Sequence, residues 1–243
     1  MINAKYQHLT AVLVHAAWAD ASNWNRITLL LQSLGFRVRS AQIPLTSLVD
    51  DIAALRRLLR RVEGPVLLVG HSYAGAVITA AATDNPQVKA LIYVAAIVPD
   101  EGETVGALFQ MAEPQPGVRP QLDPDADGFL WLPSGAFANA VAPDASPEEA
   151  ALMEVNQHPI ALKCLGEAMT AVAWKQKPSW FLIAEKDRMI SPKSQRFMAQ
   201  RIRARIHSLD VDHTPMVSAP ELVVRIIVEA ADAVVSELDP LDQ

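Results

Sequence analysis

Cysteine is almost absent from this chain of 243 residues, because Cys164 is the only one. A single cysteine excludes an intrachain disulfide and any metal site built from several thiolates, and we expect no metal. It also fits a reducing compartment, so we expect the protein in the cytoplasm. Nothing in the surrounding sequence marks Cys164 as activated, and we expect a small, packed side chain there.

An excess of basic residues is also lacking. Lysine and arginine together number 21 against 27 aspartate and glutamate residues, which gives a formal net charge of −6. A sequence without a basic stripe argues against nucleic acid as a partner. No apolar run approaches the ~18 residues of a membrane span, and residues 1–10 lack the features of a signal peptide. We therefore expect neither a nucleic-acid nor a membrane partner, and a homodimer stays open.

The glycine-rich signatures of nucleotide binding are missing as well. No G-x-G-x-x-G motif follows a strand-like run, so a dinucleotide-binding fold has no fingerprint here. Gly70 and Gly75 have the spacing of a phosphate-binding loop, but Ala76 and Val77 stand where that loop needs lysine and then serine or threonine. We expect a protein that works without a cofactor.

What the sequence does contain is an alternation of strand-like and helix-like segments. Apolar residues make up 51% of the chain, enough for one large domain. The alternation predicts an α/β fold with a mainly parallel sheet and helices on both faces. We expect six strands, at residues 9–15, 36–43, 66–70, 88–95, 180–184 and 205–209. Ser191 and Ser218 are predicted to cap the last two helices, Ser218 in a capping box with Glu221.

The alternation breaks between residues 100 and 173. Prolines, glycines and acidic residues interrupt every apolar run in this stretch. Such a segment does not continue the sheet, and we expect a cap inserted over the carboxyl ends of the strands, where open α/β folds bind ligands. The predicted organisation is a core of residues 1–99 and 174–243 with a cap of residues 100–173.

The most informative motif follows the apolar run at residues 66–69. It reads Gly-His-Ser-Tyr-Ala-Gly, with Ser72 flanked two residues either side by Gly70 and Ala74. A serine between small residues, after a strand and before a helix, is the pattern of a nucleophile elbow. The turn exposes the hydroxyl at a helix N-terminus, where backbone N–H groups favour negative charge.

A serine nucleophile needs a base, and the base needs an acid to orient it. His213 is the candidate base, because it lies between the last predicted strand and the last predicted helix. Asp187 is the candidate acid, just past the strand at residues 180–184, and Asp100 is its rival in the loop after the strand at residues 88–95. The order Ser72, Asp187, His213 is that of the α/β-hydrolase fold.

An oxyanion hole needs two backbone donors. The N–H of Tyr73 is one candidate, and the other is expected in the loop after the first strand, which reads His15-Ala16-Ala17-Trp18. We expect His15 to be structural. His71 adjoins the nucleophile, so we expect its side chain to point away from it.

Together these motifs resemble the small α/β-hydrolases of the plant methyl-ester esterase and hydroxynitrile lyase branch, and more closely their bacterial esterase relatives. The resemblance covers nearly the whole chain. The family's H-G-A-W loop matches residues 15–18, its G-H-S-x-x-G motif residues 70–75, and its H-x-x-M-x-S-x-P motif residues 213–220. Further matches are P-D-E-G-E at residues 99–103, D-G-F-L-W-L at residues 127–132, and the acid loop with Q-R-F-M at residues 186–198.

The resemblance implies a role for each matched residue. Ser72 would be the nucleophile, Asp187 the acid and His213 the base, while Ala17 and Tyr73 would supply the oxyanion N–H groups.

Three positions bear on the comparison with the family. Ala16 replaces the family's usual glycine, and Lys186 replaces the usual acidic residue before the catalytic aspartate. The lyases of this branch carry a lysine directly after the histidine, where this chain has Thr214. That difference favours ester hydrolysis over cyanohydrin cleavage.

We therefore expect a serine hydrolase that cleaves a carboxylic ester of a small, largely apolar molecule through an acyl-enzyme. Two alternatives remain: a lyase on the same scaffold, and a ligand-binding protein of the hydrolase fold with little turnover. Trp18 and the cap residues Phe109, Trp131 and Phe137 are candidates to line the substrate pocket, with Trp131 as the expected roof. Aromatic residues in such a segment also form cores of their own.

Overall fold

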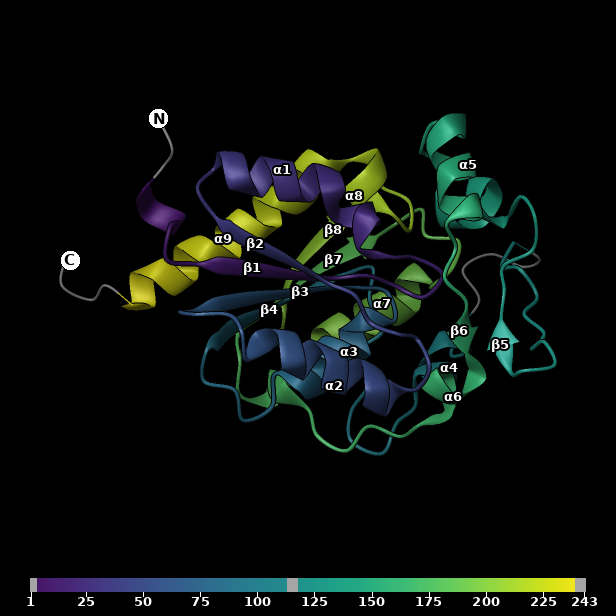
Figure 1. Ribbon diagram of the computed structural model, residues 1–243, viewed down its shortest axis with the longest axis horizontal. Helices are drawn as coiled ribbons and strands as arrows, with labels where there is room; N and C mark the ends of the chain where they lie inside the picture. The colour runs from purple at the N-terminus through teal and green to yellow at the C-terminus, as the bar shows by residue number, and fades with distance from the viewer. Residues whose placement is uncertain (1–3, 113–117, 239–243) are drawn as a thin grey trace.

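The protein is built on a single parallel sheet (Figure 1). The computed structural model describes residues 4–112 and 118–238. Its strands lie in the order β2-β1-β3-β4-β7-β8, and every neighbouring pair is parallel. They are β1 Thr10–Val14, β2 Arg37–Ala41, β3 Val66–His71, β4 Val88–Val94, β7 Ser179–Ala184 and β8 Arg205–Leu209. The predicted fold class, with its six strands, is confirmed.

The strand order places the ends of β1 and β3 side by side. β1 pairs with β2 on one side and with β3 on the other, and its register sets Val14 beside Gly70. β3 pairs in turn with β4, so that His71 lies beside Val94. The chain thus winds first toward β2 and then toward β8, and the loops after β1 and β3 flank the point where the direction changes. This is where open α/β sheets bind ligands.

Helices cover both faces of the sheet. Figure 1 shows α1 (Asn25–Ser33) and α9 (Pro220–Leu238) above it, and α2 (Leu48–Leu59) and α3 (Ala74–Ala81) below it. Leu13 packs in one apolar cluster with α1 and α9, whereas Val12 and Val14 pack in a second with α2, α3 and α7 (Pro192–Arg201). Burial on both faces explains why the strands read as continuous apolar runs. The shorter core elements are η1 Ala4–Tyr6, η2 Ala21–Trp24, η4 Ala173–Lys175 and α8 Pro215–Ser218.

One of the two predicted helix caps is present. Ser191 stands at the N-cap of α7, and its hydroxyl accepts a hydrogen bond from the N–H of Lys193 at 3.3 Å. The capping box predicted at Ser218 is wrong. Ser218 is the last residue of α8, α9 begins at Pro220, and the Ser218 hydroxyl donates to the carboxylate of Asp212 at 2.8 Å. The nearby buried carboxylate holds the hydroxyl away from the helix start.

The described residues of the segment 100–173 add no strand to the main sheet. They form α4 Val105–Phe109, β5 Phe129–Leu130, the π-helix η3 Phe137–Val141, α5 Pro147–Val155, β6 Ile160–Ala161 and α6 Leu162–Gly166. β5 and β6 make a separate antiparallel pair. Figure 1 shows α4, α5, α6, β5 and β6 beyond the carboxyl ends of the main strands. Residues 113–117 lie outside the described residues, and the division into core and cap stays a prediction.

Helix α3 packs so closely against the loop after β4 that Gly75 has no room for a side chain. A Cβ there would lie 2.5 Å from the carbonyl oxygen of Ile97 and 2.8 Å from the Cβ of Ala96. Gly75→Ala should therefore lower the free energy of unfolding by about 1–3 kcal/mol, the usual effect of overpacking. Denaturant unfolding measures this.

Gly166→Ala is the matched control for the change in helix propensity. Gly166 is also helical, but a Cβ there meets no atom within 4 Å. Equal unfolding midpoints for the two variants would contradict the close approach of α3.

Candidate active site

The turn between β3 and α3 holds Ser72 in a strained conformation. Its φ of 54° lies in the left-handed region that residues with a side chain rarely adopt. Three backbone hydrogen bonds hold it there: the Ser72 N–H donates to Val94 at 3.1 Å, and the Ser72 carbonyl accepts from Gly75 and Ile97 at 3.0 Å each. The strain is stored at the residue that the sequence singles out as the nucleophile, as expected of a functional turn.

The candidate base and acid lie in hydrogen-bond contact. Asp187 lies just past the end of β7, and His213 lies between β8 and α8. The two side chains are buried, and Nδ1 of His213 is 2.7 Å from Oδ2 of Asp187. Because the carboxylate accepts, Nδ1 carries the hydrogen and Nε2 is left to act as a base. Within the described residues neither Nε2 of His213 nor the hydroxyl of Ser72 makes a hydrogen bond, so the two groups are not joined directly in this structure.

The carboxylate of Asp187 is fixed on every side. Its Oδ1 accepts from the backbone N–H groups of Met189 and Ile190, at 2.7 and 2.8 Å. Its Oδ2 accepts from Nε2 of Gln195 at 2.7 Å as well as from His213. Gln195 is fully buried, and its Oε1 accepts from the N–H of Ala184 at 3.0 Å. The sequence did not indicate this role of Gln195, since a glutamine within a helix gives no signal of its own.

Asp100, the rival acid, lies elsewhere. Its carboxylate pairs with Lys175 at 2.9 Å, and this contact lowers the pKa of Asp100. Asp212, the chain neighbour of His213, is buried, and its oxygens accept from the N–H groups of Thr214 and Asp144. Of these three carboxylates, it is that of Asp187 that contacts the ring of His213.

His71 supports the base in a way that the sequence did not indicate. Its Nε2–H donates to the backbone carbonyl of His213 at 2.7 Å, and the two rings lie 4.8 Å apart between centroids. Burial holds the pKa of His71 well below its ordinary value, so the ring is neutral and does not repel a protonated His213. His71, the last residue of β3, therefore holds the backbone of the candidate base His213 in place.

The two candidate oxyanion donors are free. The backbone N–H groups of Ala17 and Tyr73 make no hydrogen bond to any residue in the described part of the chain. The loop that carries Ala17 is held at both ends. Nε2 of His15 accepts from the N–H of Ile43 at 3.1 Å, while the indole N–H of Trp18 donates to the carbonyl of Leu130 at 2.9 Å.

His15 has the structural role that we expected. Its Nδ1–H donates to the carbonyl of Ala16 at 2.9 Å, and burial lowers the pKa of the ring to about 4. A neutral ring with both nitrogens engaged in backbone bonds is not available for proton transfer.

A buried carboxylate lies behind the second oxyanion donor. The hydroxyl of Tyr73 donates to Asp51 at 2.6 Å, and Asp51 also accepts from the N–H of Leu45 at 2.7 Å. Asp51 is fully buried, and desolvation raises its pKa to about 6. Cys164 lies against the same carboxylate at 3.8 Å, and burial raises the pKa of its thiol to about 12. A thiol of that pKa is not a nucleophile at neutral pH.

Two of the four candidate pocket residues reach the site. A cavity of about 10 Å³ lies against His213, and Trp18 and Phe137 line it together with apolar neighbours such as Met189. Phe109 and Trp131 are not among its lining residues.

The indole of Trp131 is turned to a different partner. Trp131 is 48% exposed and its N–H donates to the carboxylate of Asp125 at 2.9 Å. Phe109 packs beside Arg119, whose guanidinium carbon lies 4.2 Å from the ring centroid. The structure thus gives no support to Trp131 as the roof of the pocket, because its hydrogen bond to the Asp125 turn holds the ring at the surface.

Within residues 4–112 and 118–238, no three His, Cys, Asp or Glu side chains are grouped so as to hold a metal ion. In the same ranges, no helix has the length and apolar character needed to cross a membrane.

A parallel sheet whose central strand ends in a strained serine turn defines an α/β-hydrolase fold. The alpha/beta hydrolase family model matches residues 11–226, and the chain belongs to that family. Both the fold and the family predicted from the sequence are thereby confirmed.

The named relatives include two esterases. The chain is 25% identical to methylesterase 3 of Arabidopsis thaliana, across 93% of this chain and 96% of that protein. It is 33% identical to a carbendazim hydrolyzing esterase of Nocardioides sp. (strain SG-4G), across 42% of this chain and 48% of that protein.

Solved structures share the fold along nearly the whole chain. Polyneuridine aldehyde esterase aligns with a TM-score of 0.80 at 18% identity, covering 93% of this chain and 100% of that one. A pyrethroid hydrolase from Sphingobium faniae JZ-2 aligns with a TM-score of 0.81 at 22% identity, covering 93% and 98%. At these identities the likeness shows the fold.

The raised pKa of Asp51 predicts a pH-dependent stability. Because the folded state holds this proton more tightly than the unfolded chain, Asp51 stabilises the fold at low pH, and this contribution is lost as the pH rises through about 6. The unfolding free energy of the wild type minus that of Asp51→Asn should fall between pH 4 and pH 7. The fall should be on the order of 3 kcal/mol, since each tenfold change in proton affinity corresponds to about 1.4 kcal/mol.

Asp50→Asn is the control on the same helix. Hydrogen bonds from Ser47 and Thr46 lower the pKa of Asp50, so its contribution has the opposite sign and is lost as the pH falls. Urea unfolding at several pH values measures both. A difference curve for Asp51→Asn that is flat from pH 4 to pH 7 would contradict the burial of an ionisable carboxyl there.

Proposed function

We propose that this protein is a serine hydrolase that cleaves carboxylic esters of small, largely apolar molecules. The observation that carries the proposal is the buried His213–Asp187 pair, whose imidazole ring lies 4.8 Å between centroids from that of His71, the residue before the strained Ser72. The apolar lining of the adjoining cavity, by Trp18, Phe137 and Met189 among others, supports an apolar group beside the reacting carbonyl.

The residues divide the reaction into two steps. The Ser72 oxygen attacks the ester carbonyl carbon while Nε2 of His213 takes the hydroxyl proton. The N–H groups of Ala17 and Tyr73 stabilise the oxyanion, and Asp187 stabilises the protonated imidazole. His213 then returns the proton to the leaving alcohol as the bond to it breaks. Water, activated by the same imidazole, attacks the acyl group on Ser72 and releases the acid.

The relatives support an ester as the substrate class. The names methylesterase, carbendazim hydrolyzing esterase and polyneuridine aldehyde esterase all describe esterases. In the lyases that the sequence resembles, a lysine follows the histidine. Here that position holds Thr214, which is buried and whose hydroxyl donates to the carbonyl of Val141 at 3.2 Å. The Thr214 hydroxyl is uncharged and already donates a hydrogen bond, so it offers no positive charge to stabilise a cyanide leaving group.

Ser72→Ala tests the nucleophile. A fluorophosphonate should lose fluoride and form a covalent phosphonyl ester on the Ser72 oxygen of the wild type, visible as a mass increase of the intact protein. Ser72→Ala should take up no label and hydrolyse no p-nitrophenyl acetate above background, because the hydroxyl is the reacting atom. Ser33→Ala, an exposed serine of α1, should label like the wild type. Labelled and active Ser72→Ala protein would overturn the serine mechanism.

Asp187→Asn and Asp100→Asn test the acid. We expect Asp187→Asn to lower kcat by about 10⁴, because an amide no longer holds the reactive tautomer of the histidine. Asp100→Asn should change kcat little, since its carboxylate pairs with Lys175 at 2.9 Å. Steady-state rates on p-nitrophenyl acetate give the comparison, with circular dichroism to confirm that both variants fold. The reverse ranking would move the acid to the loop after β4.

A further inference from the structure

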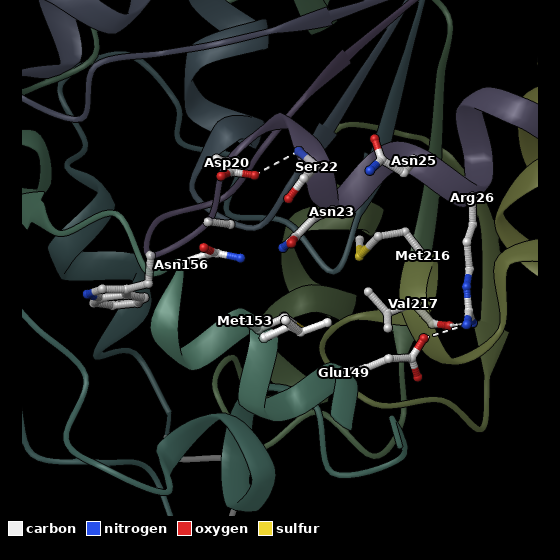
Figure 2. A pocket seen from close by; sticks show the side chains of 13 residues that line it. Asp20, Ser22, Asn23, Asn25, Arg26, Glu149, Met153, Asn156, Met216 and Val217 are labelled. Atoms are coloured by element: carbon white, nitrogen blue, oxygen red, sulfur yellow. Dashed lines mark hydrogen bonds and ion pairs between the residues drawn. The ribbon is translucent and has the colours of Figure 1, made fainter. Parts of the chain in front are cut away.

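The cavity beside His213 is too small for a substrate. Its volume of about 10 Å³ has room for about one water molecule. A larger space adjoins it: a pocket of about 280 Å³ between the η2 segment and helix α5 (Figure 2), which we call the η2–α5 pocket. Trp18, Ala19, Asn23 and Met153 line both spaces. The large pocket therefore begins where the small cavity ends.

The wall of the η2–α5 pocket carries amide groups without protein partners. Asn23, Asn25 and Asn156 line it, and none of their side chains is hydrogen-bonded to a residue that the structure describes. Figure 2 shows the amides of Asn23 and Asn156 pointing toward each other, with Met153 below them in this view. Each amide offers both a donor and an acceptor to a ligand.

The charged groups of the pocket are already engaged. A carboxylate oxygen of Asp20 accepts from the N–H of Ser22 at 2.7 Å. Arg26 pairs with Glu149 at 2.5 Å and donates to the carbonyl of Val217 at 2.8 Å. An anionic group would meet two carboxylates and a guanidinium that already has its partners. The lining thus disfavours an anionic group.

Apolar side chains complete the pocket and separate it from the reaction centre. Met153, Met216 and Val217 form an apolar floor opposite the amides. Met153 packs against both apolar clusters and borders both spaces. Its unbranched thioether side chain changes rotamer readily. The helix that carries it is held in place, because the Arg26–Glu149 ion pair ties α5 to α1 and a capping box of Ser146 and Glu149 fixes its start.

We propose that the η2–α5 pocket is a substrate subsite. It binds a neutral, hydrogen-bonding group such as a carboxamide. The apolar part of the ester carries this group at a distance from the reacting carbonyl. The side chain of Met153 lies between this group and the triad, and it changes rotamer so that the apolar part of the ester can pass. The inference rests on the proposed ester hydrolysis and adds to it the chemistry of the distal end of the substrate.

A panel of matched esters tests the subsite. One series consists of p-nitrophenyl esters that carry an alkyl substituent on the acyl side. The other consists of acetate esters that carry the same substituent on the alcohol side. In both series the substituent ends in a carboxamide, an isopropyl group or a carboxylate. In one series the wild type should prefer the carboxamide, as judged by kcat/KM. Asn156→Leu should lower the ratio of carboxamide to isopropyl ester by about three- to tenfold, the effect of losing one hydrogen bond.

Val155→Leu is the matched control on the same helix, because Val155 is 78% exposed and does not line the pocket. It should keep the wild-type ratio. Equal ratios for Asn156→Leu and Val155→Leu in both series would overturn the subsite. Asn156→Asp gives a second, opposite test: it should raise kcat/KM for a trimethylammonium-ended ester relative to the carboxamide, and no rise would count against the proposal.

Binding separates this inference from the proposed function. Calorimetry with the Ser72→Ala variant measures the affinity for the carboxamide-ended ester without turnover. Weaker binding when Asn156→Leu is added supports the subsite, whether or not the wild type hydrolyses the ester. Unchanged binding overturns it, even where hydrolysis itself is established.

Discussion

The close approach of the start of helix α3 to the end of β3 and to the loop after β4 is the constraint on which the rest of the site depends. A Cβ at Gly70 would lie 2.8 Å from the carbonyl oxygen of Ala74, and one at Gly75 would lie 2.5 Å from that of Ile97. Only with both side chains absent can the chain leave β3, pass through the left-handed conformation of Ser72 and enter α3 at once. Strain of this kind costs about 1–3 kcal/mol, which the hydrogen bonds of Ser72 to β4 and the following loop offset. The geometry leaves the N–H of Tyr73 unpaired beside the hydroxyl.

This constraint explains why much of the protein was predictable. A turn that tolerates only small residues at fixed positions can be recognised from those residues. Strands buried on both faces can be recognised from their continuous apolar runs. Once Ser72 is placed at the end of β3, the parallel sheet requires its partners to follow later strands. His213 and Asp187 were found in this way, and their 2.7 Å contact agrees with the assignment.

Other parts could not be read from the sequence, because they depend on contacts between distant residues. Asp51 lies next to Asp50, yet only Asp51 is buried, against Tyr73 and Leu45. His71 holds the backbone of the candidate base through a bond that spans 142 positions of the chain. In the segment 100–173, which lacks periodicity, composition alone could not tell the buried Phe137 from the half-exposed Trp131.

The hydrogen bond from the Trp18 indole to Leu130 affects which changes in sequence the protein can accept. The acceptor is a main-chain carbonyl, so it is present whichever side chain stands at position 130. The hydrogen bond itself therefore needs no particular side chain at position 130, although the Leu130 side chain is buried in the core. An insertion or deletion before Leu130 would instead displace the carbonyl itself. The position of the loop after β1 thus depends on the length of the segment before Leu130.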